Sequence, residues 1–220
     1  FQKYNLKTTL MGHPIHYLDK SFNIKIKKTL NIVFMPGSRL SELNKLFPYF
    51  DLAYKYLLKN SSDASIFIPT LPHLENNIKD LVKHWKINTI VTSNISEIEN
   101  NFNIINRALV CSGTASLEIA KRNIPQLVIY KLNIITELIV NLFVKIKYAN
   151  IINIIENKMI IPELTNSNLN QKEFIKEFIK LISDETVASN QIQNINRTLK
   201  KIEVSTPPYS FAANLIISYL

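Results

Sequence analysis

The stretch "NIVFMPGSRLSELNKLF", from Asn31 to Phe47, decides the fold of this chain. It begins as an uninterrupted apolar run, turns through Pro-Gly-Ser-Arg at residues 36–39, and continues with a helical pattern. An apolar run without alternation is typical of a strand that is buried on both faces of a parallel sheet. The stretch therefore predicts a strand that leads through a tight turn into a helix.

The same alternation of strand and helix continues along the chain. Short runs rich in β-branched residues predict strands at residues 6–11, 30–35, 64–69, 87–92, 107–113 and 125–131. The segments between them predict helices at residues 42–59, 74–85, 95–101, 115–122 and 134–148. From about Gln171 the pattern is helical, with a break at residues 205–210 before a last helix. This alternation predicts an α/β fold with a doubly wound, Rossmann-like parallel sheet.

Composition limits the kind of protein. The chain has 220 residues, of which 46% are hydrophobic, enough to bury a real core. Cys111 is the single cysteine, so no internal disulfide can form, which fits a reducing compartment. The formal net charge of +9 favours an anionic partner such as phosphate, nucleic acid or an acidic membrane surface, although a compositional bias toward Lys, Asn and Ile would also produce it. We find no nucleic-acid motif and expect no nucleic-acid partner.

One apolar stretch, residues 134–148, raises the question of a membrane. Glu137, Asn141 and Lys145 interrupt it at a spacing of four residues, which places one polar stripe on an otherwise apolar helix. A bilayer span needs about 20 apolar residues. We therefore expect a buried helix, or one that touches a membrane surface, rather than a transmembrane helix.

Two predicted loops carry the candidate chemistry. Gly37 and Ser38 follow a buried strand, with Arg39 beside them, and the triplet at residues 112–114 opens a later helix. In an open parallel sheet, ligands bind at the carboxyl ends of the strands. Glycine lets a ligand approach the backbone closely, and the N–H groups of a first helical turn favour a phosphate. Arg39 can add a forked contact to a diphosphate.

A simpler interpretation of each loop stays open. Ser38 and Thr114 are good helix caps. Gly37 and Gly113 suit tight turns, and Arg39 would then be a solvated side chain. Each loop alone favours this alternative, whereas two such loops on one sheet edge favour a phosphate site. Neither loop has the pattern of a P-loop or of a dinucleotide motif, so the sequence disfavours nucleoside triphosphatases and standard dinucleotide enzymes.

Among the remaining polar side chains, Glu118 is the best candidate. It lies one helical turn beyond Thr114 on the same face, where a carboxylate can accept hydrogen bonds from a ribose. The alternative is a surface charge that favours the start of a helix. The chain has four histidines, His13, His16, His73 and His84. Their spacing matches no metal site, so we expect no metal and no other cofactor; Cys111 ends a buried strand, which favours packing over nucleophilic chemistry.

Six motifs occur along the chain in the order MGHPI, MPGSRLSEL, CSGTASLEIA, PQLVIYK, YANIINII and IPEL. Together they resemble the C-terminal half of lipid-A-disaccharide synthase, a family of GT-B glycosyltransferases with two Rossmann-like domains. The resemblance implies an inverting, metal-independent transfer of 2,3-diacylglucosamine from its UDP derivative to 2,3-diacylglucosamine 1-phosphate. The products are lipid A disaccharide 1-phosphate and UDP. Another UDP-sugar enzyme, such as a UDP-N-acetylglucosamine 2-epimerase, or a non-catalytic truncated UDP-binding remnant, stays open as an alternative.

The resemblance also implies roles for single residues. Arg39 would stabilise the diphosphate as charge grows on the leaving UDP, and Glu118 would hold the ribose. Asn153 would be catalytic together with Arg39, although Ile-Ile precedes it where the family usually has Leu-Pro. Both Asn153 and Glu163 should face the cleft. The implied donor site comprises Gly37, Ser38, Arg39, Ser112, Gly113, Thr114, Glu118 and Glu163.

By the same resemblance, the chain divides into three parts. Residues 1–15 would end an N-terminal acceptor domain, residues 16–204 would form the UDP-sugar-binding domain, and residues 205–220 would form a C-terminal crossover helix. The chain begins at Phe1, so we expect a processed or truncated product without the acceptor domain and its general base. The implied partners are the UDP-2,3-diacylglucosamine donor, the 2,3-diacylglucosamine 1-phosphate acceptor and a membrane surface. The implied location is cytoplasmic, peripheral on the inner face of the cytoplasmic membrane.

Overall fold

The fold was analysed in a computed structural model, which describes residues 8–9, 15, 29–61, 63–111, 113–131, 147–203 and 207–218. Several sequence predictions fall outside these residues. Only residues 8 and 9 of the predicted strand at 6–11 are described, and most of the predicted helix at 134–148 is not. Ser112 also lies outside the described residues.

A parallel sheet of six strands forms the centre of the described fold. Its strands lie in the order β3-β2-β1-β4-β5-β6. Their bounds are β1 Asn31–Met35, β2 Ser65–Pro69, β3 Asn88–Thr92, β4 Arg107–Cys111, β5 Gln126–Tyr130 and β6 Glu163–Thr165. The first five were predicted from the sequence. The sixth was not, because three residues are too few to show a pattern.

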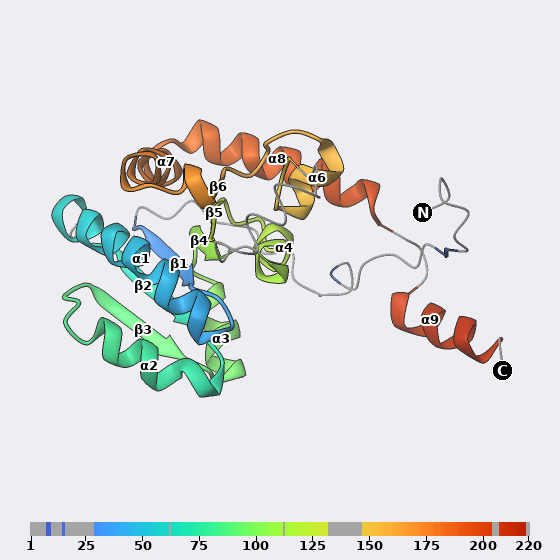
Figure 1. The fold of residues 1–220 in the computed structure, drawn as a ribbon, viewed down its shortest axis with the longest axis horizontal. Coiled ribbons are helices and arrows are strands. Elements are labelled where there is room, and N and C mark those ends of the chain that lie inside the picture. Colours follow the sequence, from blue (N-terminus) through green and yellow to red (C-terminus); the bar gives the residue numbers. More distant parts are fainter. Residues whose placement is uncertain are drawn as a thin grey trace.

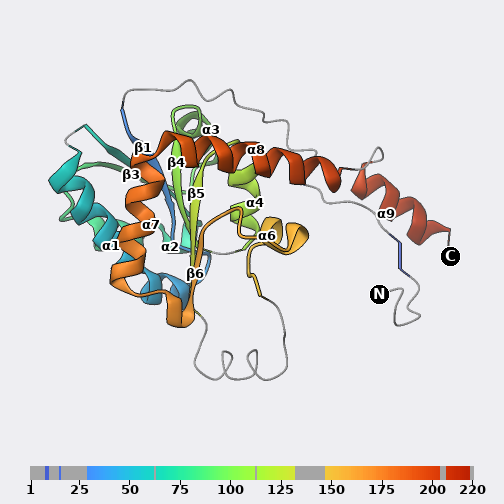
Figure 2. The same cartoon turned by 90° about the horizontal axis from the view of Figure 1, so that it is seen from above.

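Helices cover both faces of this sheet. They are α1 Leu40–Asn60, α2 Pro72–Val82, α3 Ile95–Phe102, α4 Thr114–Lys121, α6 Ile151–Glu156, α7 Gln171–Ser183, α8 Glu185–Lys201 and α9 Pro208–Ile217, with a short 3-10 helix at Asn166–Asn168. Figure 1 shows the sheet between its helices, and Figure 2 shows α1 and α7 on one side of the strands and α4 and α6 on the other. The predicted doubly wound architecture is confirmed.

Two hydrophobic cores, one on each face, explain the uninterrupted apolar runs. In β1, Ile32 and Phe34 join the core that packs against α1, α2 and α7. Val33 points the other way, into the core that packs against α3, α4 and α8. All three side chains are fully buried. Since successive strand residues face opposite sides, a strand buried on both sides has no polar positions to alternate with.

The end of α2 differs from the prediction. The helix ends at Val82, whereas the sequence predicted a helix up to residue 85. The chain turns there, and the N–H of Trp85 donates to the carbonyl of Val82 at 2.8 Å. This turn sends the indole of Trp85 back into the core, where it stacks on Tyr54 with 4.6 Å between ring centroids. Burial of a large aromatic side chain thus ends the helix early.

The strand order fixes where a ligand can bind. After β1 the chain moves outward to β2 and β3, and after β4 it moves the opposite way to β5 and β6. Beyond the carboxyl ends of the neighbouring strands β1 and β4, the two connections therefore diverge and leave a crevice. The loops that follow these strands are the two that the sequence singled out.

Candidate functional site

The loop between β1 and α1 is organised by Glu42. One carboxylate oxygen, Oε2, accepts a hydrogen bond from the backbone N–H of Ser38 at 3.0 Å. The other, Oε1, pairs with Nη1 of Arg39 at 2.9 Å. Gly37 has a φ of +109°, and a Cβ there would lie 2.7 Å from Glu42 Oε2. Only glycine fits this turn without strain or collision.

The alternative interpretation of Ser38 as a helix cap is wrong, because Arg39 occupies the cap position of α1 and makes no side-chain cap hydrogen bond. The Glu42 carboxylate, in the first turn of α1, instead accepts a backbone N–H group at this end of the helix, that of Ser38. The Arg39 side chain is 73% exposed. The Glu42 side chain is 18% exposed, so the pair is open to solvent on its Arg39 side, from which the guanidinium can turn toward an anionic ligand.

The loop between β4 and α4 leaves open space. Gly113 holds the cap position of α4 with a φ of +147°, and, apart from its chain neighbours, no atom of the described residues lies within 4 Å of the position a Cβ would take. Thr114 is the first residue of the helix, so it is not the cap that the sequence allowed. A ligand can therefore approach this backbone closely, next to the free N–H groups of the first turn.

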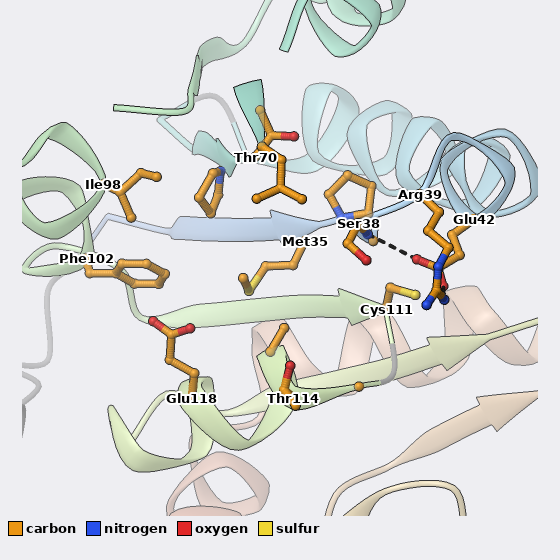
Figure 3. Close-up of a pocket in the computed structure, with 16 residues that line it drawn as sticks. Met35, Ser38, Arg39, Glu42, Thr70, Ile98, Phe102, Cys111, Thr114 and Glu118 are labelled. Atoms are coloured by element: carbon orange, nitrogen blue, oxygen red, sulfur yellow. Dashed lines mark hydrogen bonds and ion pairs between the residues drawn. The ribbon is translucent and has the colours of Figure 1, made fainter. Parts of the chain in front are cut away.

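A pocket of about 480 Å³ joins the two loops. Figure 3 shows that Arg39, Glu42 and Cys111 lie at one end of it, whereas Ile98, Phe102 and Glu118 lie at the other. Its lining comprises Met35, Pro36, Gly37, Ser38, Arg39, Glu42, Pro69, Thr70, Leu71, Ile98, Phe102, Cys111, Gly113, Thr114, Ala115 and Glu118. One end of the pocket thus holds the Arg39–Glu42 ion pair beside the Gly37 turn, and the other end holds apolar side chains and the Glu118 carboxylate.

Glu118 is held in place at the apolar end of the pocket. Its Oε1 accepts hydrogen bonds from Nη2 and Nε of Arg122 at 2.9 and 3.3 Å. The carboxylate is 34% exposed, whereas the Arg122 side chain is 3% exposed. The predicted position of Glu118 at the ligand-binding edge of the sheet agrees with this geometry.

Sequence reasoning missed several pocket residues, among them Glu42, Thr70, Ile98 and Phe102. Thr70 follows β2 directly, and its Oγ1 is buried without a hydrogen-bond partner in the described part of the chain. Ile98 and Phe102 reach the pocket from α3. The position of Thr70 after a strand could have revealed it, since every carboxyl strand end meets this edge. The two α3 residues carry no such signal, because their apolar spacing is that of any helix that packs on a sheet.

Cys111 lines the pocket but is a poor nucleophile. Burial raises the pKa of its thiol from 9.0 to about 12, and the nearby Glu42 carboxylate adds to the rise. The thiolate, which is the reactive form, is therefore scarce at neutral pH. Within the described residues, no group of three or more His, Cys, Asp and Glu side chains could hold a metal ion.

Asn153 does not face the cleft, contrary to the prediction. It is fully buried, and its Oδ1 accepts from the backbone N–H groups of Ile160 and Ile161 at 2.7 and 2.9 Å. Its Nδ2 donates to the carbonyl of Ile161 at 2.7 Å. The side chain is thus committed to the turn after α6. A buried amide must satisfy its polar atoms, and here the backbone does so.

Glu163 is also turned inward. It is 8% exposed, and its carboxylate accepts the backbone N–H groups of Ala149 at 3.0 Å and Asn150 at 2.7 Å. These two residues border a second cavity of about 250 Å³ that shares Gly113 and Thr114 with the first. Glu163 therefore fixes the loop before α6 and lies behind the ligand-facing surface.

Comparison with known proteins decides the family. The family model of lipid-A-disaccharide synthetase matches residues 1–213. The chain belongs to this family. Among its curated relatives is the lipid-A-disaccharide synthase of Rickettsia prowazekii, which is 31% identical over 98% of the chain and 59% of the relative. The chain spans about half the length of the first curated relatives it matches, between 45% and 59%.

Solved structures support the same fold. The lipid-A-disaccharide synthetase chain resembles WaaG, a glycosyltransferase involved in lipopolysaccharide biosynthesis, with a TM-score of 0.55 and 13% identity over 85% of this chain and 47% of that one. It also resembles S. aureus TarM, solved in complex with fondaparinux, α-GlcNAc-glycerol and UDP, with a TM-score of 0.58 and 10% identity over 89% of this chain and 37% of that one. At such identities the likeness shows the fold alone, which is the GT-B type. None of the described helices has the length and apolar character needed to cross a bilayer.

Proposed function

We propose that this chain is the UDP-sugar-binding half of a lipid-A-disaccharide synthase, and that UDP occupies the pocket between the β1–α1 and β4–α4 loops. The observation that carries the proposal is the polarity of this pocket. One end holds the exposed Arg39 guanidinium, paired with Glu42, beside the Gly37 turn, whereas the other end holds Ile98, Phe102 and the Glu118 carboxylate. A nucleoside diphosphate has the matching polarity, with its phosphates at one end and its base at the other.

In this proposal the diphosphate lies at the end of the pocket that holds Arg39. Gly37 and Gly113 let its oxygens approach the backbone, and the first turns of α1 and α4 offer N–H groups. Ser38, Ser112 and Thr114 add hydroxyl groups to the same loops. Arg39 stabilises the negative charge that grows on UDP as the sugar leaves, a role that needs no metal ion.

The nucleoside lies at the other end. The carboxylate of Glu118 accepts hydrogen bonds from the ribose, and the base packs between Ile98 and Phe102. Thr70 Oγ1, which is buried and has no hydrogen-bond partner among the described residues, is available to the nucleotide. Asn153 and Glu163 contribute indirectly, since both hold the segment around α6 from behind.

For the whole protein we propose the family's reaction. The sugar transferred is 2,3-diacylglucosamine, from UDP-2,3-diacylglucosamine to 2,3-diacylglucosamine 1-phosphate, at the inner surface of the cytoplasmic membrane. Residues 16–204 form the donor domain in this proposal, residues 1–15 the junction, and residues 205–220 a helix that crosses back. The acceptor and the general base belong to the part of the family's length that this chain does not match. The family match over residues 1–213 favours this reaction over a UDP-sugar epimerase.

Calorimetric titration with UDP tests the proposal. We expect UDP to bind the full 220-residue chain, and Arg39→Ala to weaken binding by about 1–3 kcal/mol because a charged hydrogen bond is lost. Uridine, which has no phosphates, should bind equally weakly to both proteins.

Lys176→Ala is the matched control. Lys176 forms an exposed ion pair with Glu173 three residues away, just as Arg39 does with Glu42. Its loss should leave the UDP affinity unchanged. A folded wild-type chain that binds no UDP, or an equal loss in both variants, would rule out the proposed site.

A further inference from the structure

Arg122 forms an unusual junction behind the pocket. It follows α4 directly, at its carboxyl end, four residues after Glu118. Its guanidinium contacts Glu118 on α4 and also reaches Glu99 on α3, with Nη2 to Oε1 at 3.1 Å and Nη1 to Oε2 at 3.3 Å. The carbon atom of the guanidinium lies 4.0 Å from the ring centroid of Phe102. One buried cation thus joins two carboxylates and an aromatic ring from two helices.

This junction restricts the Glu118 side chain. A glutamate that is about one-third exposed samples several rotamers, and binding a ligand would cost it that freedom. Two hydrogen bonds from Arg122 to the same oxygen, Oε1, reduce that freedom before any ligand arrives. In the described part of the chain, Oε2 of Glu118 has no hydrogen-bond partner. The carboxylate is therefore pre-organised with one oxygen anchored and one oxygen available.

The anchor itself cannot easily move. The Arg122 side chain is 3% exposed, and Glu99 and Phe102 attach it to α3, on the opposite wall of the pocket. Phe102 in turn packs edge-on against Phe67 of β2, with 5.7 Å between centroids. Glu99 thus gives Arg122 a second carboxylate partner besides Glu118.

We propose that Arg122 is a positioning residue for Glu118, and that this pair makes the site selective for nucleotides with ribose hydroxyls. The proposal rests on the proposed function, because it needs a nucleotide in the pocket. It adds to the site a residue that does not line the pocket. Arg122 would affect the preference for ribose hydroxyls through Glu118, without contacting the nucleotide. The selectivity depends on a geometry that spans α3 and α4.

The test compares UDP with 2′,3′-dideoxyuridine 5′-diphosphate by calorimetry. The wild-type chain should prefer UDP by roughly ten- to hundredfold, the range for charge-assisted hydrogen bonds. Arg122→Met removes the charge and keeps an apolar side chain near Phe102. We expect this variant to lose most of the preference, while its affinity for the dideoxy nucleotide stays within about twofold.

Arg107→Met is the matched control. Arg107 is also buried and bonded to two helices, through the carbonyl of Leu181 and the carboxylate of Glu185, but it lies at the amino end of β4. Its loss should lower stability without changing the preference for UDP. If Arg122→Met does not fold, Arg122→Lys is tested in its place. A lysine cannot bind both carboxylates with the forked geometry of arginine, so this variant should also have a reduced preference for UDP.

The outcomes separate the two claims. A wild-type chain that binds neither nucleotide contradicts the proposed function, and the role of Arg122 falls with it. A wild-type chain that binds both equally contradicts the ribose role of Glu118. If the wild type discriminates and a folded Arg122 variant keeps the full preference, or if both nucleotides weaken equally in that variant, the positioning role alone is wrong.

Discussion

At the scale of the residue, the site depends on a few side chains that the backbone places and other side chains orient. Glu42 holds the Ser38 backbone N–H and the Arg39 guanidinium at once. Its own position leaves no room for a side chain at Gly37. The Arg39 end of the pocket is therefore shaped by a carboxylate. An anionic ligand would have to draw the exposed Arg39 guanidinium away from Glu42.

Replacement of the two loop glycines should separate strain from collision. Gly113→Ala meets no neighbouring atom, so it should lower the free energy of unfolding only by the backbone strain, about 1–3 kcal/mol. Gly37→Ala adds a collision with Glu42 to the strain and should cost more. Urea denaturation of both variants measures the difference. An equal or smaller loss for Gly37→Ala would contradict the geometry of this loop.

Sequence reasoning found the residues whose position in the chain reveals them. Gly37, Arg39 and Glu118 stand at or just after strand-helix junctions, and junctions on one sheet edge must converge. It could not find Glu42 or Arg122, because their roles depend on ion pairs that form across neighbouring turns and helices. These contacts depend on side-chain rotamers and packing, which produce no recognisable residue spacing in the sequence.

At the scale of the element, asparagine occupies positions with a positive φ, which glycine usually occupies. The chain has three glycines, and Asn123, Asn157 and Asn166 adopt left-handed backbone conformations with φ of 56°, 47° and 48°. Asn157 ends α6 in this way. Asparagine tolerates the left-handed region better than other residues with a Cβ. A chain with few glycines can therefore still form the left-handed residue that ends a helix such as α6.

Buried amides also join the elements around the site. The N–H of Gln126 in β5 donates to Oε1 of Gln191 in α8 at 2.6 Å, and Nε2 of Gln191 donates back to the carbonyl of Gln126 at 3.0 Å. Oε1 of the Gln126 side chain accepts a hydrogen bond from the hydroxyl of Ser116 in α4 at 2.8 Å. Ser116 accepts from Asn150 at 2.6 Å, just before α6. This chain of hydrogen bonds fixes α4 relative to α6 and α8.

Asn153→Ala tests the structural role that the fold gives this residue. The change leaves the N–H groups of Ile160 and Ile161 without their acceptor, so the free energy of unfolding should fall by about 2–4 kcal/mol. UDP affinity of the folded variant should change less than about threefold, since Asn153 lies behind the site. Thermal or urea denaturation and calorimetry supply the two numbers.

Asn194→Ala is the control for that experiment, because the Asn194 side chain donates to the carbonyl of Asn190 within an exposed turn of α8. It should shift stability by at most about 0.5 kcal/mol. If Asn153→Ala folds with full stability but loses UDP binding, the residue contacts the donor and the structural role is wrong.

At the scale of the whole molecule, the doubly wound sheet could be predicted because both of its faces are buried, which removes alternation from the strands. The last strand and α6 could not. They contain three and six residues, shorter than the window in which a period of two or 3.6 becomes visible. Yet β6 contains Glu163 and α6 contains Asn153. The two elements that the sequence pattern did not predict therefore contain two residues that support the site.

The arrangement of the whole molecule gives the pocket its direction. The divergence of the chain after β1 and β4 opens it. The β1–α1 loop places the exposed Arg39 guanidinium, paired with Glu42, at one end, and α3 and α4 place apolar side chains and the Glu118 carboxylate at the other. This direction is the central claim, because it states which way a UDP molecule must lie. It follows from the strand order together with the side chains at each end.

A crystal structure of the full 220-residue chain with UDP tests this claim most directly. We predict density for the diphosphate between residues 37–39 and the start of α4, with the ribose hydroxyls on Glu118 and the base between Ile98 and Phe102. A nucleotide bound in the reverse direction, or bound away from this pocket in a crystal where the pocket is open to solvent, would contradict the account.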